Sequence, residues 1–291
     1  MNTTELIAAL KIKGSFPTSD DLFSTSDFLV LLNHQMKTEI IPIMMLLSEE
    51  YFLLSKDFTV STSGATYRIP SRAIGAKLRD LKHLDGSNNM VSLQRLFEED
   101  RPSNMTGYYM VRNSVELSEG FTSGTLRMKY FGRPNSLVST TSCAQITSIN
   151  TGTNQIIVSS LPTTMSDGIL CDFVQNKNPY DLLDYDNEIV NVSGTTVTMT
   201  SLPTDLVVGD WLCLAEESPV PMVPEELHPV LVQSALVAAL SSKKDKATDF
   251  EAKLLERVKQ DAIRMLDPRV ENDSISFRSG RMLGYFTNRW Y

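Results

Sequence analysis

The spacing of hydrophobic residues divides the chain into helical ends and a strand-rich middle. Between Ser26 and Leu54, apolar residues recur every three or four positions, which is the period of a helix with one buried face. Ser26 is the expected N-cap, and Asp27 lies in the first turn, where the helix dipole favours a negative charge. Pro42 lacks a backbone N–H, so the pattern predicts a kink or a break there.

The segment that follows alternates between apolar and polar residues, which is the period of a half-buried strand. It predicts a hairpin that turns at residues 63–64, a short helix over 92–99, and a second strand pair formed by 107–117 and 125–130. Pro134 ends this segment, because proline cannot donate to a strand ladder.

Residues 135–223 are rich in Ser and Thr and contain an internal repeat. The run Ser160–Thr163, with Gly168 after it, recurs 41 residues later as Ser201–Thr204, with Gly209 after it. A β-rich run precedes each copy. Two copies are too few for a solenoid, so the repeat predicts a small barrel or sandwich built by duplication.

The helical period returns after a proline-rich hinge that ends at Pro224. Pro229 fits the first turn of one helix, and a second helix carries an apolar residue at every fourth position until Asp267 and Pro268 end it. The residues of that apolar row are Phe250, Leu254, Val258, Ala262 and Leu266. A short Lys-rich loop joins the two helices, which predicts antiparallel packing.

These patterns predict an α+β fold in three parts. A helical bundle with β-hairpins comprises residues 1–134 and 224–272. The duplicated β-module over 135–223 is inserted into it, and residues 273–291 form an extended C-terminal arm.

The net charge of −8 is unevenly distributed. The β-module has ten acidic residues and one basic residue, Lys177, whereas the last 18 residues have three arginines and no acid. An acidic chain is a poor candidate for reading the sequence of duplex DNA, which requires a clustered basic face.

The cysteines and the N-terminus indicate folding in a reducing cytoplasm and no membrane segment. Cys143, Cys171 and Cys213 are odd in number and form no CxxC motif. The N-terminus lacks the pattern of a secretory signal, and no apolar run approaches the roughly 20 residues that span a bilayer.

No motif indicates catalysis or a cofactor. The chain lacks GxGxxG, GxxxxGK[ST], HExxH and GxSxG, so we expect no catalytic, cofactor-binding or metal-ligating residues and no enzyme activity. His34, His83 and His228 are expected to have structural or solvated roles, and His228 is expected at a helix start.

Two features of the β-module can be interpreted either as a binding site or as ordinary structure. Asp184, Asp186 and Glu188 would share one face of an extended segment and offer oxygen ligands to calcium, although a solvated acidic turn is the favoured interpretation. Trp211 follows a turn at Asp210 and is expected to pack in the core of the module, with stacking on a sugar as the alternative.

The last 18 residues interleave arginine with aromatic residues, a composition typical of an interface. We favour an ordered arm that docks on another subunit. Packing against its own chain, disorder, and binding to single-stranded nucleic acid are the alternatives.

Several short motifs together resemble tailed-bacteriophage head-to-tail connector proteins of the adaptor or neck-ring type. They are LRMKYFGRP at 126–134, VGDWL at 208–212, VPMVPEELHPVLV at 220–232 and DPRV at 267–270. The resemblance implies a helical bundle with a β appendage that assembles as a ring, commonly of twelve copies, beneath the portal protein. It implies no catalytic residues.

The resemblance also implies a function. The protein would be a structural virion protein of the phage neck, made in the host cytoplasm, that joins the portal to an adjacent tail or neck protein. Genomic DNA would pass through the ring lumen without sequence-specific binding. Another virion assembly role, in tail completion or capsid decoration, and a carbohydrate-binding module are the alternatives. The residues expected to contact the portal or a neighbouring subunit are Phe277, Arg278, Arg281, Tyr285, Phe286, Arg289, Trp290 and Tyr291.

Overall fold

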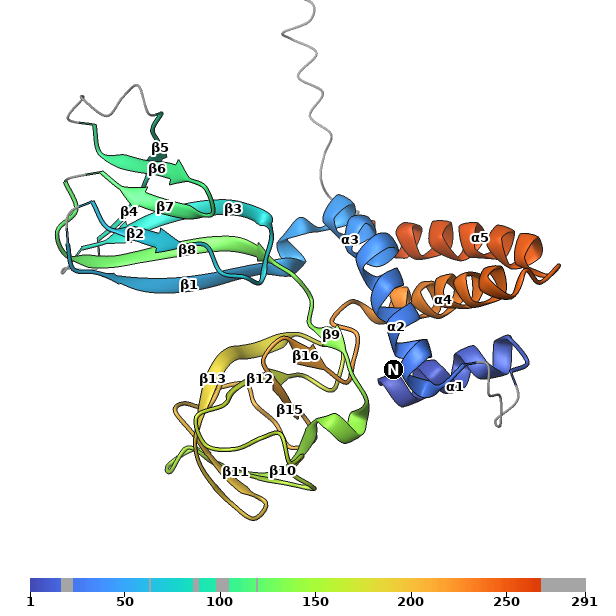
Figure 1. Cartoon of the computed structure of the whole chain (residues 1–291). Coiled ribbons are helices and arrows are strands. Elements are labelled where there is room, and N and C mark those ends of the chain that lie inside the picture. The colour runs from blue at the N-terminus through green and yellow to red at the C-terminus, as the bar shows by residue number, and fades with distance from the viewer. Residues whose placement is uncertain (17–22, 63, 86–88, 98–104, 119, 268–291) are drawn as a thin grey trace, which may run out of the picture.

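The computed structural model describes residues 1–16, 23–62, 64–85, 89–97, 105–118 and 120–267. They form a helical bundle, a pair of four-stranded sheets and a closed six-stranded barrel (Figure 1). The predicted α+β class is therefore confirmed. The predicted arm over 273–291 lies outside the described residues.

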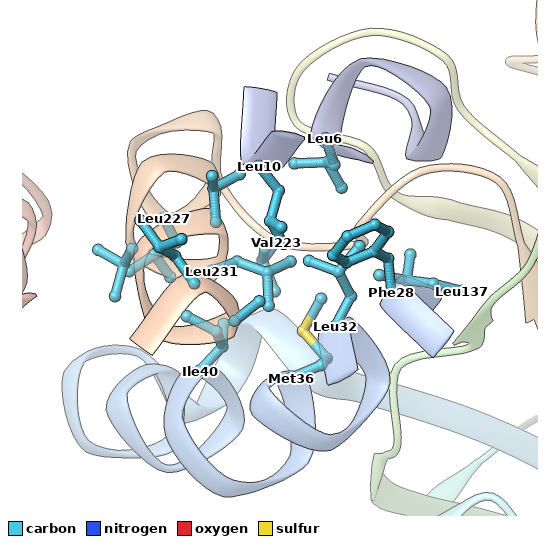
Figure 2. Close-up of a cluster of buried hydrophobic side chains, with 14 of the residues drawn as sticks. Leu6, Leu10, Phe28, Leu32, Met36, Ile40, Leu137, Val223, Leu227 and Leu231 are labelled. Atoms are coloured by element: carbon cyan, nitrogen blue, oxygen red, sulfur yellow. The ribbon is translucent and has the colours of Figure 1, made fainter. Parts of the chain in front are cut away.

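The helical bundle combines the two ends of the chain. Its elements are α1 (Thr3–Lys13), α2 (Thr25–Gln35), the π-helical turn η1 (Met36–Ile40), α3 (Ile41–Leu47), η5 (Glu225–Leu227), α4 (His228–Lys243) and α5 (Thr248–Leu266). Helix α4 lies at the centre, in contact with α1, α2 and α5. Figure 2 shows its Leu231 among Leu10, Leu32 and Ile40, all fully buried. The apolar spacing seen in the sequence thus marks faces that converge on α4.

The start of α2 corrects the predicted cap. Ser24, not Ser26, caps the helix: its hydroxyl accepts from the backbone N–H of Asp27, and the Asp27 carboxylate accepts from the backbone N–H of Ser24 at 2.8 Å. This reciprocal pairing requires the acidic residue three positions after the cap, which only Ser24 provides. Pro42 lies in the first turn of α3, directly after the π-helical turn η1, so the regular α-helix is interrupted there although the backbone stays helical and the chain does not break.

Helices α4 and α5 lie side by side (Figure 1), but the predicted apolar row of α5 is partly wrong. Phe250 is 68% exposed, and the buried residues of the helix are Leu255 and Ala262. Residues four apart advance by about 400° around a helix of 3.6 residues per turn, so the row drifts away from the bundle. A spacing of seven keeps Leu255 and Ala262 on one side.

A short 3-10 turn, η2 (Glu49–Phe52), leads into two sheets that face each other. Sheet order β1-β8-β3-β4 contains β1 (Leu53–Val60), β8 (Gly124–Gly132), β3 (Ala73–Leu84) and β4 (Met90–Ser92). Sheet order β2-β7-β6-β5 contains β2 (Thr66–Arg68), β7 (Ser114–Leu117), β6 (Gly107–Val111) and β5 (Gln94–Arg95). Both sheets contribute to one core, in which Leu126 and Val115 are fully buried.

Three predictions for this region are wrong. The strands that flank residues 63–64 do not form a hairpin, because β1 pairs with β8 and β2 pairs with β7 in the other sheet. Residues 90–95 form β4 and β5, where a helix over 92–99 was expected. Residues 107–117 are two strands of one hairpin, and β8 belongs to the opposite sheet. Alternating polarity indicates a strand but does not specify its partner.

Residues 144–214 form the predicted small barrel. Its strands are β10 (Ala144–Asn150), β11 (Gln155–Val158), β12 (Leu170–Val174), β13 (Leu182–Ser193), β14 (Thr196–Met199) and β15 (Trp211–Leu214), in the closed order β10-β11-β14-β13-β12-β15. If β10, β11 and β12 are exchanged with β13, β14 and β15, every strand keeps the same pair of neighbours, so the barrel consists of two halves with equivalent topology.

Equivalent positions of the sequence repeat also have equivalent structure. Met165 and Leu206 are both buried, and each donates its backbone N–H to the proline three residues earlier. Gly168 and Gly209 both have positive φ, at 80° and 102°. The prediction of a barrel built by duplication is confirmed.

A small parallel pair of strands, β9 (Ser136–Leu137) and β16 (Glu217–Ser218), precedes and follows the barrel. The Asn33 side chain on α2 bonds to both backbone groups of Leu137, accepting from its N–H at 2.7 Å and donating to its carbonyl at 2.8 Å. Strand β9, which leads into the barrel, is therefore attached to the bundle through hydrogen bonds between the Asn33 side chain and the Leu137 backbone.

Candidate functional site

A buried charged network joins the barrel to the paired sheets. Arg72, directly before β3, is 3% exposed, and its guanidinium donates to both carboxylate oxygens of Asp172 on β12 at 2.8 and 2.7 Å. It also donates to Asp186 on β13 at 2.9 Å. Burial lowers the pKa of Arg72, but the bonds to the two carboxylates outweigh it and raise that pKa above its usual value. The guanidinium therefore stays charged.

The remaining oxygen positions of Asp172 are also occupied. Its carboxylate accepts from the Asn135 side chain at 2.6 Å and from the backbone N–H groups of Asp186 and Glu216 at 3.1 and 3.0 Å. A buried ion pair contributes to the fold only when such additional hydrogen bonds are present. The network thus fixes one orientation of the barrel relative to the sheets.

Asp184, Asp186 and Glu188 lie within strand β13, which corrects the favoured solvated turn, and the first two have partners other than a calcium ion. Asp186 binds Arg72, and Asp184 accepts from the Asn187 side chain at 2.8 Å. The register of β13 shifts in this segment, and Asp186 has a φ of 55°, so the expected common face is lost. Glu188 is exposed. Within the described ranges, no three His, Cys, Asp or Glu residues are grouped so that they could hold a metal ion.

His228 is the first residue of α4, as expected, and it is fully buried. Its Nε2 lies 3.2 Å from the Val223 carbonyl, which only accepts, so Nε2 carries the proton. Nδ1 then accepts from the amino group of Met1 at 3.0 Å, and this amino group also donates to the Tyr180 hydroxyl at 3.1 Å. Burial and the charge on Met1 lower the pKa of His228 to about 4. No sequence signal indicated this contact.

The other histidines also have structural or solvated positions. His34 is exposed on α2, and His83 places Nε2 2.8 Å from the Ser123 carbonyl. Trp211 is 8% exposed, and its indole donates to the Asn176 side chain at 2.8 Å. It packs beside Tyr180 in a cluster outside the barrel core, so the expected core position is corrected. Its ring has no exposed face on which a sugar could stack.

A cavity of about 250 Å³ lies where the bundle, the sheets and the barrel meet. Tyr51 of η2, Tyr180 and Asp181 before β13, and Arg133 after β8 line it. The Tyr51 hydroxyl donates to the Pro179 carbonyl, which ties η2 to the barrel. Cofactor and ligand pockets hold about 300–1,000 Å³, so this cavity suits a side chain rather than a cofactor.

Asp181 is the distinctive residue of this cavity. Among the described residues, none forms an ion pair or hydrogen bond with its carboxylate, although its backbone carbonyl accepts from Gln175 at 3.0 Å. Desolvation raises the pKa of Asp181. Sequence reasoning did not single out Asp181, because nothing local distinguishes it from the other acids of the segment.

The helices carry large apolar side chains on their outer surfaces. Ile12 on α1, Val30 on α2, Leu46 on α3, and Phe250 and Met265 on α5 are 79%, 67%, 84%, 68% and 68% exposed. Among the described residues, no helix combines the length and the apolar content that crossing a membrane requires. The exposed side chains belong to four different helices of the bundle.

The eight residues expected to contact the portal or a neighbouring subunit all lie outside the described residues. They are Phe277, Arg278, Arg281, Tyr285, Phe286, Arg289, Trp290 and Tyr291.

Comparison with known proteins identifies no relative: no protein-family model matches the chain, and no curated protein is significantly similar to it.

Proposed function

We propose that this protein is a structural subunit of a ring in the neck of a tailed bacteriophage, where it joins the portal to the tail. The observation that carries the proposal is the set of exposed apolar side chains on α1, α2, α3 and α5. Isolated exposed apolar residues are common, but large ones on four helices of one bundle favour an assembly that covers them.

A ring explains why these residues lie on several helices. In a cyclic assembly each subunit uses two different flanks, one for each neighbour. Val30 and Phe250, on different helices, then serve different flanks. The bundle forms the wall of the ring, and the charged network at Arg72 holds the barrel in one orientation relative to the paired sheets.

The acidic barrel suits a position near DNA that must slide. Asp172 and Asp210 are buried, so they do not contribute to the outer surface. The exposed acids of the module are Asp167, Asp181, Glu188, Asp205 and Glu216. A surface with this charge repels the phosphate backbone, which lets a genome pass without being bound.

The arm over 273–291 supplies the contact to the portal or to the neighbouring subunit. Its arginine and aromatic residues are the types that dominate interface energetics. Deletion of residues 274–291 tests this role: capsids should no longer bind the truncated protein or retain DNA. Normal binding and retention would show that the arm is not an anchor.

Ring formation has its own test. Native mass measurement and negative-stain images of the purified chain, or of particles that contain it, should show a closed ring with one mass. A strict monomer in both preparations would contradict the proposal. Particles that carry the protein on the shell, without a ring at the neck, would instead favour a capsid-decorating role.

A further inference from the structure

The cavity between the three units has a carboxylate that lacks a cationic partner. Asp181 lines it and is exposed there, and no described residue pairs with its carboxylate. The other acids of this segment differ, because Asp184 and Asp186 are both engaged by side chains of the same subunit. Asp181 is therefore placed to receive a cation from outside the subunit.

Two tyrosines form part of the cavity wall, and both are held in place. The Tyr51 hydroxyl donates to the Pro179 carbonyl, and the Tyr180 hydroxyl accepts from the amino group of Met1. Tyr180 is 7% exposed and packs 5.0 Å from the ring of His228. Because these rings are already ordered, binding at the cavity costs little side-chain entropy.

The combination of a carboxylate with aromatic walls selects a particular side chain. A guanidinium pairs with a carboxylate through two parallel hydrogen bonds and stacks on aromatic rings, which an ammonium does less well. The volume of about 250 Å³ accommodates one or two side chains. The site thus fits an arginine with an adjacent aromatic residue.

The chain itself contains a segment with this composition. Its last 18 residues have Arg278, Arg281 and Arg289, no acid, and aromatic residues between them. This segment carries +3, whereas the β-module that contributes Asp181 carries −9. The 24 residues after Asp267 can extend over at most about 80 Å, at about 3.3 Å per residue, which is enough to reach another subunit.

We propose that the cavity at Tyr51, Tyr180 and Asp181 binds the C-terminal arm of a neighbouring copy. An arginine of the arm pairs with Asp181, and a neighbouring aromatic side chain fills the cavity against the two tyrosines. Arg133 also lines the cavity, and its positive charge opposes entry of a cation that does not pair with Asp181. The assignment of the arm to a neighbouring copy rests on the ring proposed above. The affinity of the pocket for an arginine and an aromatic side chain does not depend on that ring.

Peptide binding tests the pocket without requiring a ring. A fluorescent peptide of residues 274–291 is titrated into a chain that ends at residue 273, and its anisotropy is measured. We expect saturable binding that Asp181→Asn weakens at least about tenfold. Asp205→Asn removes an exposed acid of the same barrel and should leave binding unchanged. A scrambled peptide of the same composition should bind less tightly.

Two results would overturn the pocket proposal. One is binding that Asp181→Asn and Asp205→Asn affect equally, since the arm would then respond only to overall charge. The other is absence of binding when the variant and the parent chain both retain their thermal stability.

A mixing experiment tests whether the arm acts between subunits. The full chain with Asp181→Asn has an arm but a defective pocket, and the chain ending at residue 273 has a pocket but no arm. We expect the two to associate in sedimentation experiments, while each alone associates weakly. Peptide binding without such association would show that the arm binds the pocket of its own subunit, and it would contradict binding between neighbouring copies. If the ring does not form but the peptide still binds, the proposed ring is wrong and the proposed pocket is retained.

Discussion

Arg72 and Asp172 form a bidentate ion pair in which both side chains are buried, although 100 residues separate them in the chain. One residue belongs to the paired sheets and the other to the barrel. The pair therefore helps to determine how two separate hydrophobic cores are oriented.

Removing this arginine should destabilise the protein strongly. Arg72→Met leaves the Asp172 carboxylate buried without its counterion, which costs about 3–5 kcal/mol. Chemical denaturation at neutral pH measures the change. The matched control is Arg127→Met, because Arg127 forms a bidentate pair with Asp57 in which the two side chains are 34% and 45% exposed. That change should cost less than about 1 kcal/mol. Equal losses in the two variants would contradict the role assigned to burial.

His228 should make stability fall as the pH is lowered. Its pKa is about 4 in the folded protein and 6.5 as the reference value, so the unfolded chain takes up the proton first. The stability associated with the neutral ring is complete above about pH 6.5 and is lost progressively towards pH 4. The loss reaches about 3 kcal/mol, at about 1.4 kcal/mol per pKa unit.

The variant His228→Gln isolates this contribution. A glutamine side chain can donate to the Val223 carbonyl and accept from the Met1 amino group, but it does not titrate. Urea denaturation from pH 7 to pH 4 should therefore show a shallower pH dependence for the variant than for the parent. Parallel pH profiles would exclude His228 as the source.

The three cysteines should be inert in the folded protein. Cys143, Cys171 and Cys213 are all buried, and burial raises the pKa of Cys171 to about 12. Because the thiolate is the reactive form, a thiol reagent should label none of them until denaturant is added. Thr204→Cys, at an exposed position of the same barrel, should be labelled at once. Rapid labelling of the parent chain would reveal local opening of the barrel.

The exposed apolar side chains of the bundle should matter for assembly and not for folding. Leu46 is 84% exposed on α3, so Leu46→Asp should change the unfolding free energy by no more than about 0.5 kcal/mol. The same substitution should abolish the ring mass, because it places a charge in a subunit contact. Gln260→Asp, an exposed polar position on α5, makes the same charge change and should leave the ring intact. If the ring still forms with Leu46→Asp, the contact between subunits does not include Leu46.

Local signals predicted the elements more reliably than their partners. The recurrence at Ser160 and Ser201 marked the barrel, because duplicated turns need the same residues in both copies. The interruption of the regular α-helix before Pro42 followed equally directly from its missing N–H. The cap at Ser24 was accessible as well, since Asp27 lies at the required spacing from it.

The long-range contacts had no comparable signal. The polarity of strand β1 alternates in the same way whichever strand it pairs with. In the folded chain it pairs with β8, where Asp57 bonds to Arg127, some 70 residues later in the sequence. Arg72 and Asp181 are ordinary charged residues in the sequence. Their different environments arise where the bundle, the sheets and the barrel meet: Arg72 lies in a complete network, whereas the Asp181 carboxylate has no partner among the described residues.

The short parallel pairing of β9 with β16 places the point where the chain leaves the paired sheets for the barrel beside the point where it leaves the barrel for the bundle. Adjacent ends are the condition under which one domain can be inserted into another without distorting it. The barrel therefore begins and ends at one place, and its orientation is set by the buried contacts between Arg72 and Asp172 rather than by its covalent connections.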